Sequence, residues 1–201
     1  MILALLLGCG RLAEEAQRHG VSLPGTTVGA PAAASTVVPD CSSATVASPA
    51  RSCLSGTLTC DGTVSGTTLG GDSAFDDAFY AGAFCFPAGD HHAGSERVFL
   101  LDAPADTDVV VTLSSSCVDL DLAAIAWDYE GSCPTEKHLI SECEGDSRRG
   151  GNGTVRMQTF APRRYLIAVD GKEGAVGPFT LSVKCTPLRP RDERDAPIPK
   201  R

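Results

Sequence analysis

Two aspartates have the spacing that metal chemistry requires. Side chains alternate along a strand, so Asp119 and Asp121 share one face while Leu120 and Leu122 point into the core. Two carboxylates on one face repel each other unless a cation joins them. A calcium ion binds about six to eight oxygen ligands, and Asp128 follows closely in the chain. Calcium held by Asp119, Asp121 and Asp128 is therefore one hypothesis, and calcium is the one cofactor that the sequence suggests.

No combination of residues predicts catalysis. Adjacent side chains on an extended chain point apart, so His91 and His92 indicate an exposed loop and not a zinc site. No motif places a carboxylate or a nucleophile beside His138, and no Gly-x-Ser-x-Gly nucleophile elbow occurs. Paired carboxylates such as Asp128 and Glu130 leave open a secreted hydrolase that uses carboxylates or a metal. We therefore assign no catalytic residue and expect that the chain is not an enzyme.

Nine cysteines, spread singly and not as Cys-x-x-Cys pairs, predict disulfides in an oxidising compartment. A zinc site is the alternative. The sequence does not determine the pairing, but some pairs are favoured. They comprise two pairs that close short loops, one that ties the ends of the domain together, and the pair that then remains: Cys53–Cys60, Cys133–Cys143, Cys41–Cys185 and Cys85–Cys117.

The remaining cysteine follows an apolar run at the amino terminus. Leu6-Leu7-Gly8-Cys9 resembles a bacterial lipobox, in which the signal peptide is removed and the cysteine is acylated. Residues 1–9 would then be a lipoprotein signal, with Cys9 anchored to a bacterial membrane, the outer membrane in particular. A signal peptide normally carries a basic residue near its start, but no Lys or Arg precedes Cys9. A buried strand or short helix at residues 1–7 is therefore the alternative, although the even number of other cysteines favours the lipoprotein.

The chain that positions these residues has the composition of a β protein. Its 201 residues include 21 glycines and 13 prolines, with aromatic residues at 5%, which suits short strands joined by tight turns. The net charge of -8 repels phosphate backbones and argues against nucleic-acid binding. Residues 10–40, rich in Pro, Gly, Ala, Ser and Thr, indicate a flexible tether, and residues 186–201 indicate a disordered tail.

Between residues 41 and 185, short β-branched runs are separated by turn residues, as in one folded domain. Val109 and Val111 oppose Val110, an alternation that predicts one core face and one solvent-exposed face. Without a βαβ pattern, the sheets should be antiparallel, in an all-β, jelly-roll-like two-sheet sandwich held by disulfides; an up-and-down barrel is the alternative. A glycine-rich segment, 170–178, would join the last two strands as a hairpin. The expected strands are 62–68, 96–101, 108–113, 118–127, 153–160, 164–170 and 178–185.

The order of six short motifs resembles the bacterial pre-peptidase C-terminal domain over about residues 56–185. The motifs are Asp61-Gly-Thr-Val-Ser-Gly-Thr-Thr, Glu96-Arg-Val-Phe-Leu-Leu, Asp108-Val-Val-Val-Thr-Leu, Val118-Asp-Leu-Asp-Leu, Arg164-Tyr-Leu-Ile-Ala-Val-Asp-Gly and Gly177-Pro-Phe-Thr-Leu-Ser-Val. Members are β-sandwiches appended to secreted proteases and other exported proteins, so the resemblance implies an accessory or binding role. It also implies that Asp119 and Asp121 form hydrogen bonds to adjacent loops. Residues 41–60 have no counterpart and would be a local addition.

Together these features predict a non-catalytic lipoprotein of the cell envelope, a binding or structural accessory module displayed on a membrane surface, or a secreted protein. Its expected partners are the membrane, through the lipid anchor, and an extracellular protein or polysaccharide of unknown identity. Trp127 and Tyr129 would stack on a sugar ring or close the sandwich edge, and we favour the second. A disulfide-rich protease inhibitor that acts through the loop 134–142 is a further alternative.

Overall fold

The computed structural model describes residues 41, 53–83, 85–86, 91–129, 134, 140–148 and 150–189. The predicted signal and lipidation site, the tether, most of the tail and most of the proposed inhibitor loop lie outside these residues. Within the described part, no helix is long and apolar enough to cross a membrane. The elements in chain order are β1 (Leu54–Leu58), β2 (Thr63–Thr67), α1 (Asp77–Gly82), β3 (Arg97–Ala103), β4 (Thr107–Ser114), β5 (Leu120–Ala126), β6 (Cys143–Asp146), β7 (Asn152–Thr159), β8 (Arg163–Gly171) and β9 (Pro178–Pro187).

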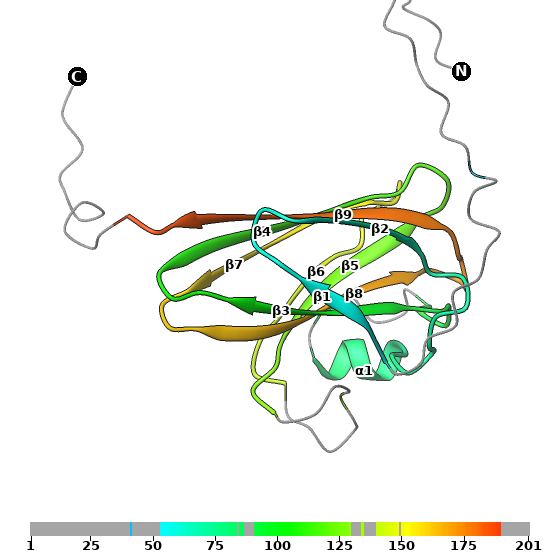
Figure 1. Cartoon of the computed structure of the whole chain (residues 1–201). Helices are drawn as coiled ribbons and strands as arrows, with labels where there is room; N and C mark the ends of the chain where they lie inside the picture. Colours follow the sequence, from blue (N-terminus) through cyan, green and yellow to red (C-terminus); the bar gives the residue numbers. More distant parts are fainter. Residues whose placement is uncertain are drawn as a thin grey trace, which may run out of the picture. The chain divides into compact units, whose positions relative to one another are not determined.

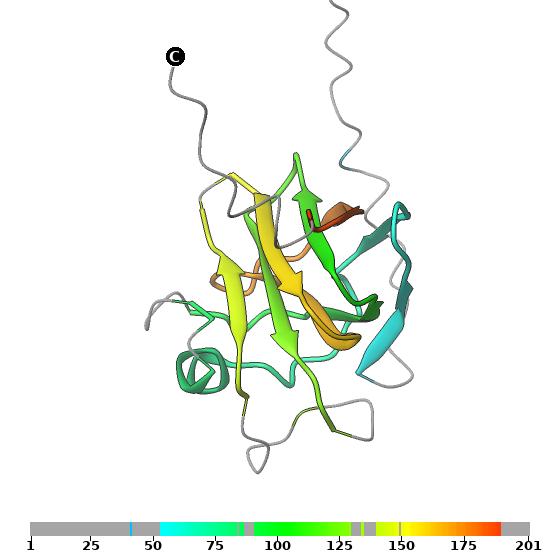
Figure 2. The same ribbon diagram turned by 90° about the vertical axis from the view of Figure 1, so that its left-hand side faces the viewer.

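The strands form two sheets that pack face to face (Figures 1 and 2). The five-stranded sheet has the order β1-β3-β8-β5-β6, and the four-stranded sheet has the order β2-β9-β4-β7. All seven expected strands are present, and the chain is an all-β sandwich as predicted. The up-and-down barrel is wrong, because the strands separate into two sheets. Residues 186 and 187, expected in the tail, belong to β9.

The core between the sheets is filled by one face of each strand. Val109, Val111 and Leu113 of β4 are completely buried, whereas Val110 is turned outward. The strand opposite in the sandwich, β5, contributes Leu122, which is also completely buried. Complete burial of one such side chain stabilises the fold by about 1.5–3 kcal/mol. The alternation read from the sequence therefore determines which face of each strand meets the other sheet.

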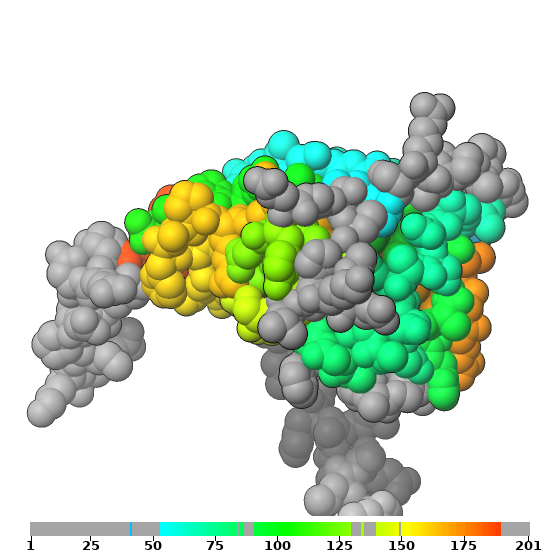
Figure 3. Space-filling view, turned by 90° about the horizontal axis from the view of Figure 1, so that it is seen from below, coloured from blue at the N-terminus to red at the C-terminus, as the bar shows by residue number. Residues whose placement is uncertain are grey.

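The other face of the five-stranded sheet is covered, although the sequence predicted that it would be exposed. The segment between β2 and β3, which includes α1, lies on this face and is called the cover layer (Figure 1). In the view of Figure 3, its atoms form much of the surface of the molecule. Helix α1 begins at Asp76, whose carboxylate accepts a hydrogen bond from the backbone N–H of Phe79. A second apolar cluster lies between the cover layer and the sheet. The cover layer contributes Phe75, Tyr80 and Phe86, and the sheet contributes Val98, Ile125 and Leu166.

Three parts of the fold differ from the prediction: one connection and two strands. The segment 170–178 does not form a hairpin, because β8 and β9 lie in different sheets. Its glycines instead let the chain pass tightly from one sheet to the other, since a Cβ on Gly171 would overlap the backbone of Ala175. β1, within the expected local addition, is an integral edge strand and pairs parallel with β3, so the sheets are not wholly antiparallel. The acidic segment 143–146 forms β6, which is not among the strands expected from the sequence.

The disulfides differ from all four expected pairs. The described cysteines pair as Cys41–Cys117, Cys60–Cys185 and Cys85–Cys143. Cys53 is also disulfide-bonded, and its partner lies outside the described residues. The expected pairs Cys53–Cys60, Cys133–Cys143, Cys41–Cys185 and Cys85–Cys117 are therefore wrong.

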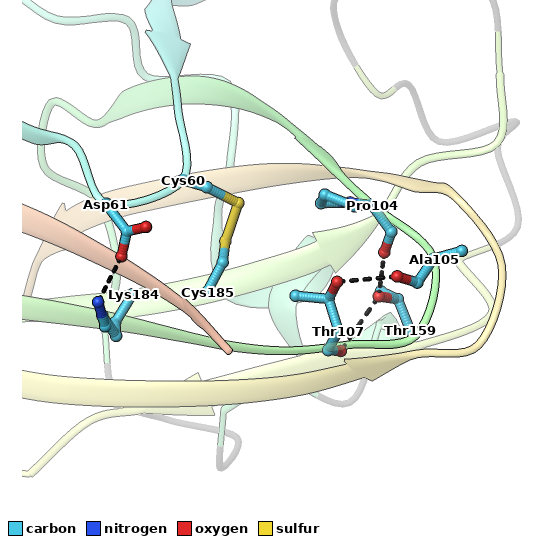
Figure 4. Close-up of a disulfide and its surroundings, with 8 residues drawn as sticks. All are labelled: Cys60, Asp61, Pro104, Ala105, Thr107, Thr159, Lys184 and Cys185. Atoms are coloured by element: carbon cyan, nitrogen blue, oxygen red, sulfur yellow. Dashed lines mark hydrogen bonds and ion pairs between the residues drawn. A yellow bond between two sulfur atoms is a disulfide. The ribbon is translucent and has the colours of Figure 1, made fainter. Parts of the chain in front are cut away.

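Strand register explains why the distant cysteines meet. β2 pairs antiparallel with β9 so that Thr63 lies opposite Ser182. Three residues further back, the same register brings Cys60 opposite Cys185, with 5.3 Å between their Cα atoms (Figure 4). Two of the predicted pairs, Cys53–Cys60 and Cys133–Cys143, were favoured because they close short loops, but each doubling of a loop adds only about 0.6 kcal/mol of closure entropy. Tertiary position, and not loop length, therefore decides the pairing.

Candidate functional site

The three aspartates proposed for calcium have separate surroundings. Asp119 accepts hydrogen bonds from the backbone N–H groups of Gly150 and Gly151, at 2.8 and 3.0 Å. Asp121 is completely buried beneath the cover layer, whereas Asp128 is exposed beyond the end of β5. Among the described residues, no three His, Cys, Asp or Glu side chains are placed to hold a metal ion. The calcium hypothesis for this set is wrong, and the loop hydrogen bonds implied by the resemblance are confirmed for Asp119.

Three buried acids form a row across neighbouring strands on the covered face. Asp121 of β5 lies directly opposite Asp170 of β8. Since Arg97 lies opposite Val169, the register of β3 with β8 brings Glu96, one residue before β3, next to Asp170. Each of the three acids is at most 1% exposed. Like charges directly opposite each other destabilise a sheet, so this acid row (Glu96, Asp170 and Asp121) requires hydrogen-bond donors or protons.

The cover layer supplies two of the donors. The hydroxyl of Tyr80, in α1, donates to Asp170 at 2.9 Å. The Nε2 atom of His92 lies 2.8 Å from Asp121 Oδ2, and this bond is completely buried. Each of these two acids therefore holds one ring of the cover layer. The sequence predicted that both His91 and His92 lie on an exposed loop, and this holds for His91 alone.

The surroundings of His92 place it between two carboxylates. Its backbone N–H donates to Asp77 Oδ1 at 2.7 Å, and its Nδ1 lies 3.6 Å from the same oxygen. Lys172 brings its Nζ within 3.8 Å of Asp121 and also donates to a backbone carbonyl at 2.9 Å. On one side the ring of Phe86 stacks on the imidazole, with centroids 4.6 Å apart. The imidazole is thus enclosed by charge partners and rings.

Glu96 is the least satisfied member of the acid row. Its Oε1 accepts a hydrogen bond from the backbone N–H of Ala74 at 2.7 Å, while its Oε2 has no hydrogen-bond partner in the described part of the chain. The pKa of Glu96 is raised from 4.5 to about 7, chiefly by burial; the Ala74 bond lowers it, and the negative charges of Asp170 and Asp72 contribute to the rise. Uncompensated burial of this kind disfavours the ionised carboxylate. Glu96 is therefore mostly protonated below pH 7 and ionises as the pH rises through about 7.

The other two acids are shifted in the same direction. Burial raises the pKa of Asp170 from 3.8 to about 6, although the bonds from Tyr80 and from the backbone of Gly171 lower it. Burial also raises the pKa of Asp121, against the hydrogen bond and charge of His92 and the charge of Lys172. The acid row therefore favours partial protonation.

The His92–Asp121 pair resembles part of a hydrolase site but is arranged for structure. A general base must reach a substrate proton, directly or through one water. The side chain of His92 is 1% exposed and lies under Phe86 and Tyr80. What the pair does is fasten the cover layer to the sheet. Polar groups with perturbed pKa values often mark functional sites, but structural networks perturb them too.

An open groove lies between the edge strands β1 and β2 of the two sheets. Its volume is about 650 Å³, within the range of small-molecule and peptide pockets. Residues from β1, β2, β3, β9 and the end of β4 line this edge groove. Hydroxyl groups dominate its polar lining: Ser55, Ser65, Thr67, Ser114, Ser115, Ser116 and Thr180.

Two phenylalanines form the apolar part of the groove. Phe99 of β3 and Phe179 of β9 meet edge to face, with centroids 6.1 Å apart. Each ring lies against a glycine of the adjoining edge strand, Gly56 of β1 for Phe99 and Gly66 of β2 for Phe179. A Cβ on Gly66 would lie 3.1 Å from the Phe179 ring. The glycines thus keep side chains away from the two rings, which border the groove although they are only 5% and 3% exposed.

Arg97 crosses the groove from one sheet to the other. It extends from β3, and its Nε donates to the carbonyl of Thr67, at the end of β2, at 2.8 Å. A second guanidinium nitrogen donates to the carbonyl of Leu69 at 2.8 Å. The guanidinium therefore fixes the position of this end of β2, which gives the groove a defined width.

The aromatic residues beside Asp128 close the second apolar cluster. Trp127 is 1% exposed and packs against Tyr129, with ring centroids 5.1 Å apart. The packing interpretation is therefore confirmed for Trp127, and a buried indole does not offer a sugar-stacking face.

Comparisons with known proteins give only distant likenesses. No known protein family matches the chain, and no curated protein is significantly similar in sequence. The pre-peptidase C-terminal domain of a Bacillus anthracis collagenase is 13% identical, with 65% of this chain and 96% of that one covered and a TM-score of 0.40. PliG of Aeromonas hydrophila, a periplasmic inhibitor of g-type lysozyme, is 14% identical, with 65% and 97% covered and a TM-score of 0.37. CorA, a surface-associated copper-binding protein of Methylomicrobium album BG8, is 8% identical, with 66% and 98% covered and a TM-score of 0.39. These likenesses are too distant to assign a family, a ligand or an activity.

Sequence reasoning missed most of both sites. It singled out Asp121 but placed it on an exposed face, and it assigned no role to Tyr80, Glu96 or Asp170. A signal for the acid row was present, because each acid begins or ends a strand face whose central residues are apolar. The same faces of β3 and β8 end on the other side in Asp102 and Arg164, which form an exposed ion pair. The edge groove had no comparable signal, since serine, threonine and glycine are common in any turn-rich β protein.

Proposed function

We propose that the chain is a non-catalytic binding module of the bacterial cell envelope, which binds its ligand in the edge groove and is held on a membrane by lipid on Cys9. The observation that carries the proposal is the groove itself, a hollow of about 650 Å³ lined by hydroxyl groups and two phenylalanine rings. Binding sites combine an apolar surface with a few fixed polar groups. The groove has this combination.

The disulfides support a location outside the cytoplasm. All seven described cysteines are disulfide-bonded, and disulfides persist in secreted and periplasmic proteins and are rare in reducing compartments. The lipobox-like Leu6-Leu7-Gly8-Cys9 supports the anchor. A binding role without turnover is favoured because the pair most similar to catalytic machinery, His92 and Asp121, is sealed beneath the cover layer.

Groove filling tests the binding site. In the variant Thr180→Trp, an indole should occupy the groove, because Thr180 lines it. Thr186→Trp is the matched control, since Thr186 is an exposed residue of the same strand and does not line the groove. The probes are a heptapeptide of alternating valine and threonine, with blocked ends, and the neutral oligosaccharide maltoheptaose. Binding is measured by backbone amide shifts in two-dimensional NMR.

The expected result is that at least one probe shifts the amides of groove residues, and that Thr180→Trp abolishes these shifts while Thr186→Trp retains them. Shifts centred on the cover layer, or groove shifts that persist in Thr180→Trp, would contradict the assignment of the groove. The absence of binding by both probes at millimolar concentration would contradict it as well.

Mass spectrometry of the protein extracted from its native membrane tests the anchor. The mature chain should begin at Cys9 and carry the added mass of acyl chains on that residue. A chain that retains Met1 and a free Cys9 thiol would refute the lipoprotein and leave the groove proposal unaffected.

A further inference from the structure

The outer edge of β2 presents backbone groups in the pattern of an unpaired strand. Two hydrogen bonds define the phase of the ladder with β9: Val183 N–H donates to the Gly62 carbonyl, and Thr68 N–H donates to the Gly177 carbonyl. In an antiparallel ladder, hydrogen-bonded and non-hydrogen-bonded positions alternate. The even-numbered residues of β2 therefore face β9, and the N–H and C=O groups of Thr63, Ser65 and Thr67 face away from it.

These outward groups are largely free to bind another chain. The Thr67 carbonyl already accepts from Arg97. For the backbone of Thr63 and Ser65, the described part of the chain provides no hydrogen-bond partner, and both residues are exposed. The donors and acceptors of Thr63 and Ser65 repeat every two residues, about 7 Å apart along the strand. An extended polypeptide backbone has the same repeat.

The charge on the edge strands distinguishes this side of the sandwich from the other. Proteins protect exposed strand edges with charged residues, proline or bulges. β6 carries Glu144 and Asp146, β7 carries Arg156, and these two strands contact each other. β2 contains neither a charged residue nor proline, and the same is true of β1 on the other side of the groove. The edge of β2, whose pairing with β9 is also regular, thus borders the groove without such protection, whereas the pairing of β1 with β3 is irregular between Leu54 and Gly56.

The groove gives an added strand a place for its side chains. Side chains alternate across a strand, so every second residue of a chain paired with β2 would turn toward Phe99 and Phe179, and the others toward solvent. Apolar side chains of moderate size, such as valine, suit the two rings and the volume of about 650 Å³. A cationic side chain would lose hydration there without gaining a carboxylate partner, because no acid lines the groove. Arg97 also lines the groove, but its guanidinium already donates to the carbonyls of Thr67 and Leu69.

We propose that the ligand of the groove is an uncharged, extended segment of a partner protein, which adds to the edge of β2 as a fifth strand of the four-stranded sheet. This inference rests on the proposed function and names the chemical class of its ligand. Strand addition of this kind uses main-chain hydrogen bonds for affinity and alternate side-chain pockets for specificity.

The variant Ser65→Pro tests strand addition. Proline removes the outward N–H of residue 65, and edge strands accept it where that N–H faces solvent. The inner ladder uses Val64 and Gly66, so β2 stays paired with β9. Ser65→Ala is the matched control, because it removes the hydroxyl that contacts Thr180 and keeps the N–H. Thermal unfolding of both variants shows that the fold is retained.

The probe is the blocked valine–threonine heptapeptide, and its dissociation constant is measured by isothermal titration calorimetry. We expect Ser65→Pro to weaken binding at least about tenfold, because a tenfold loss corresponds to roughly one main-chain hydrogen bond. Ser65→Ala should change it less than about threefold. In the complex with the wild-type chain, the amides of Thr63 and Ser65 should become protected from hydrogen exchange.

Three results would overturn the inference, and they differ from failure of the groove proposal. Equal peptide binding by Ser65→Pro and the wild type, with Thr180→Trp still blocking it, would mean that the groove binds peptide without pairing. Binding of maltoheptaose alone would make the ligand a glycan. If the wild type sediments as a dimer and binds no peptide, and Ser65→Pro converts it to a monomer, the occupant would be a second copy of this chain.

Discussion

Replacing Glu96 by glutamine should remove most of the pH dependence of stability between about pH 5 and pH 8. Glu96 is 1% exposed, and its Oε2 has no hydrogen-bond partner among the described residues. Asp170, next to it on β8, and Asp72 add negative charge, whereas the Ala74 N–H is its one described donor. Glutamine has the shape of the protonated acid and cannot ionise, so the variant isolates the contribution of this proton.

The sign follows from the direction of the shift. The pKa of Glu96 is about 7 in the folded chain against an ordinary 4.5, so near pH 6 the folded protein holds a proton that the unfolded chain has released. Stability from this group is fully present below pH 4.5 and is lost as the pH rises through 7. Between about pH 5 and pH 8 the loss amounts to about 2–3 kcal/mol. Asp170, whose pKa of about 6 is also raised, adds roughly 1 kcal/mol in the same direction.

Urea unfolding at several pH values, followed by circular dichroism, measures the effect. The wild type should lose stability steadily from about pH 5 to pH 8, whereas Glu96→Gln should lose only the smaller part that belongs to the other acids. At about pH 8 the variant should be the more stable of the two. Glu144→Gln is the matched control, since Glu144 is an exposed glutamate of β6, and its profile should follow that of the wild type.

A wild type that gains stability over this pH range, or a Glu96→Gln variant that keeps the whole slope, would contradict the raised pKa of Glu96. A lower stability of Glu96→Gln at every pH, with the slope unchanged, would show that the buried carboxyl is held by a partner that its surroundings do not reveal. Amide exchange of α1 gives a second readout, because ionisation of the acid row should release the cover layer before the sandwich.

Two further predictions concern the packing and the disulfides. Gly145→Ala should destabilise the protein by about 1–3 kcal/mol, because a Cβ there would overlap the Cys85 carbonyl and lie 2.7 Å from the Phe86 ring. Urea unfolding measures this loss of stability. The control Gly82→Ala, where a Cβ meets nothing within 4 Å, should instead be neutral or stabilising. Replacing Cys60 and Cys185 together by alanine should cost about 3–5 kcal/mol, since this disulfide spans 125 residues; an unchanged melting temperature in differential scanning calorimetry would contradict it.

The sequence predicts the strands that alternate and fails for those that do not. β4 and β9 carry a strict alternation of buried and exposed residues, so their positions and inward faces follow directly. β1 lacks an apolar alternation, since its central residues 55–57 are all exposed. Helix α1 has six residues, too few for a helical period to appear. These elements take their structure from the sheet beneath them or beside them, which the local sequence does not contain.

The disulfides and the acid row fail for a related reason. Both depend on strand register, which is set by the whole hydrophobic pattern of two partner strands. Cys60 meets Cys185 because β2 lies beside β9, and Glu96 meets Asp170 because β3 lies beside β8. A sequence read one strand at a time contains the residues of such pairs but not the pairing. Predictions based on separation along the chain therefore chose the wrong partners.

One pattern nevertheless identifies a sheet that is covered on both faces. On β5 the face that carries Asp121 continues with Ala123 and Ile125, and on β8 the face that carries Asp170 includes Leu166 and Ala168. A solvent-exposed face would carry polar residues along its length, but the β5 face carries one acid at its end, and the β8 face carries polar residues only at its two ends, Arg164 and Asp170. Burying an unpaired charge is costly, so a single acid on an apolar face implies a partner above it. The aromatic and histidine residues between β2 and β3 are the partners, and the acids determine where the cover layer is fastened.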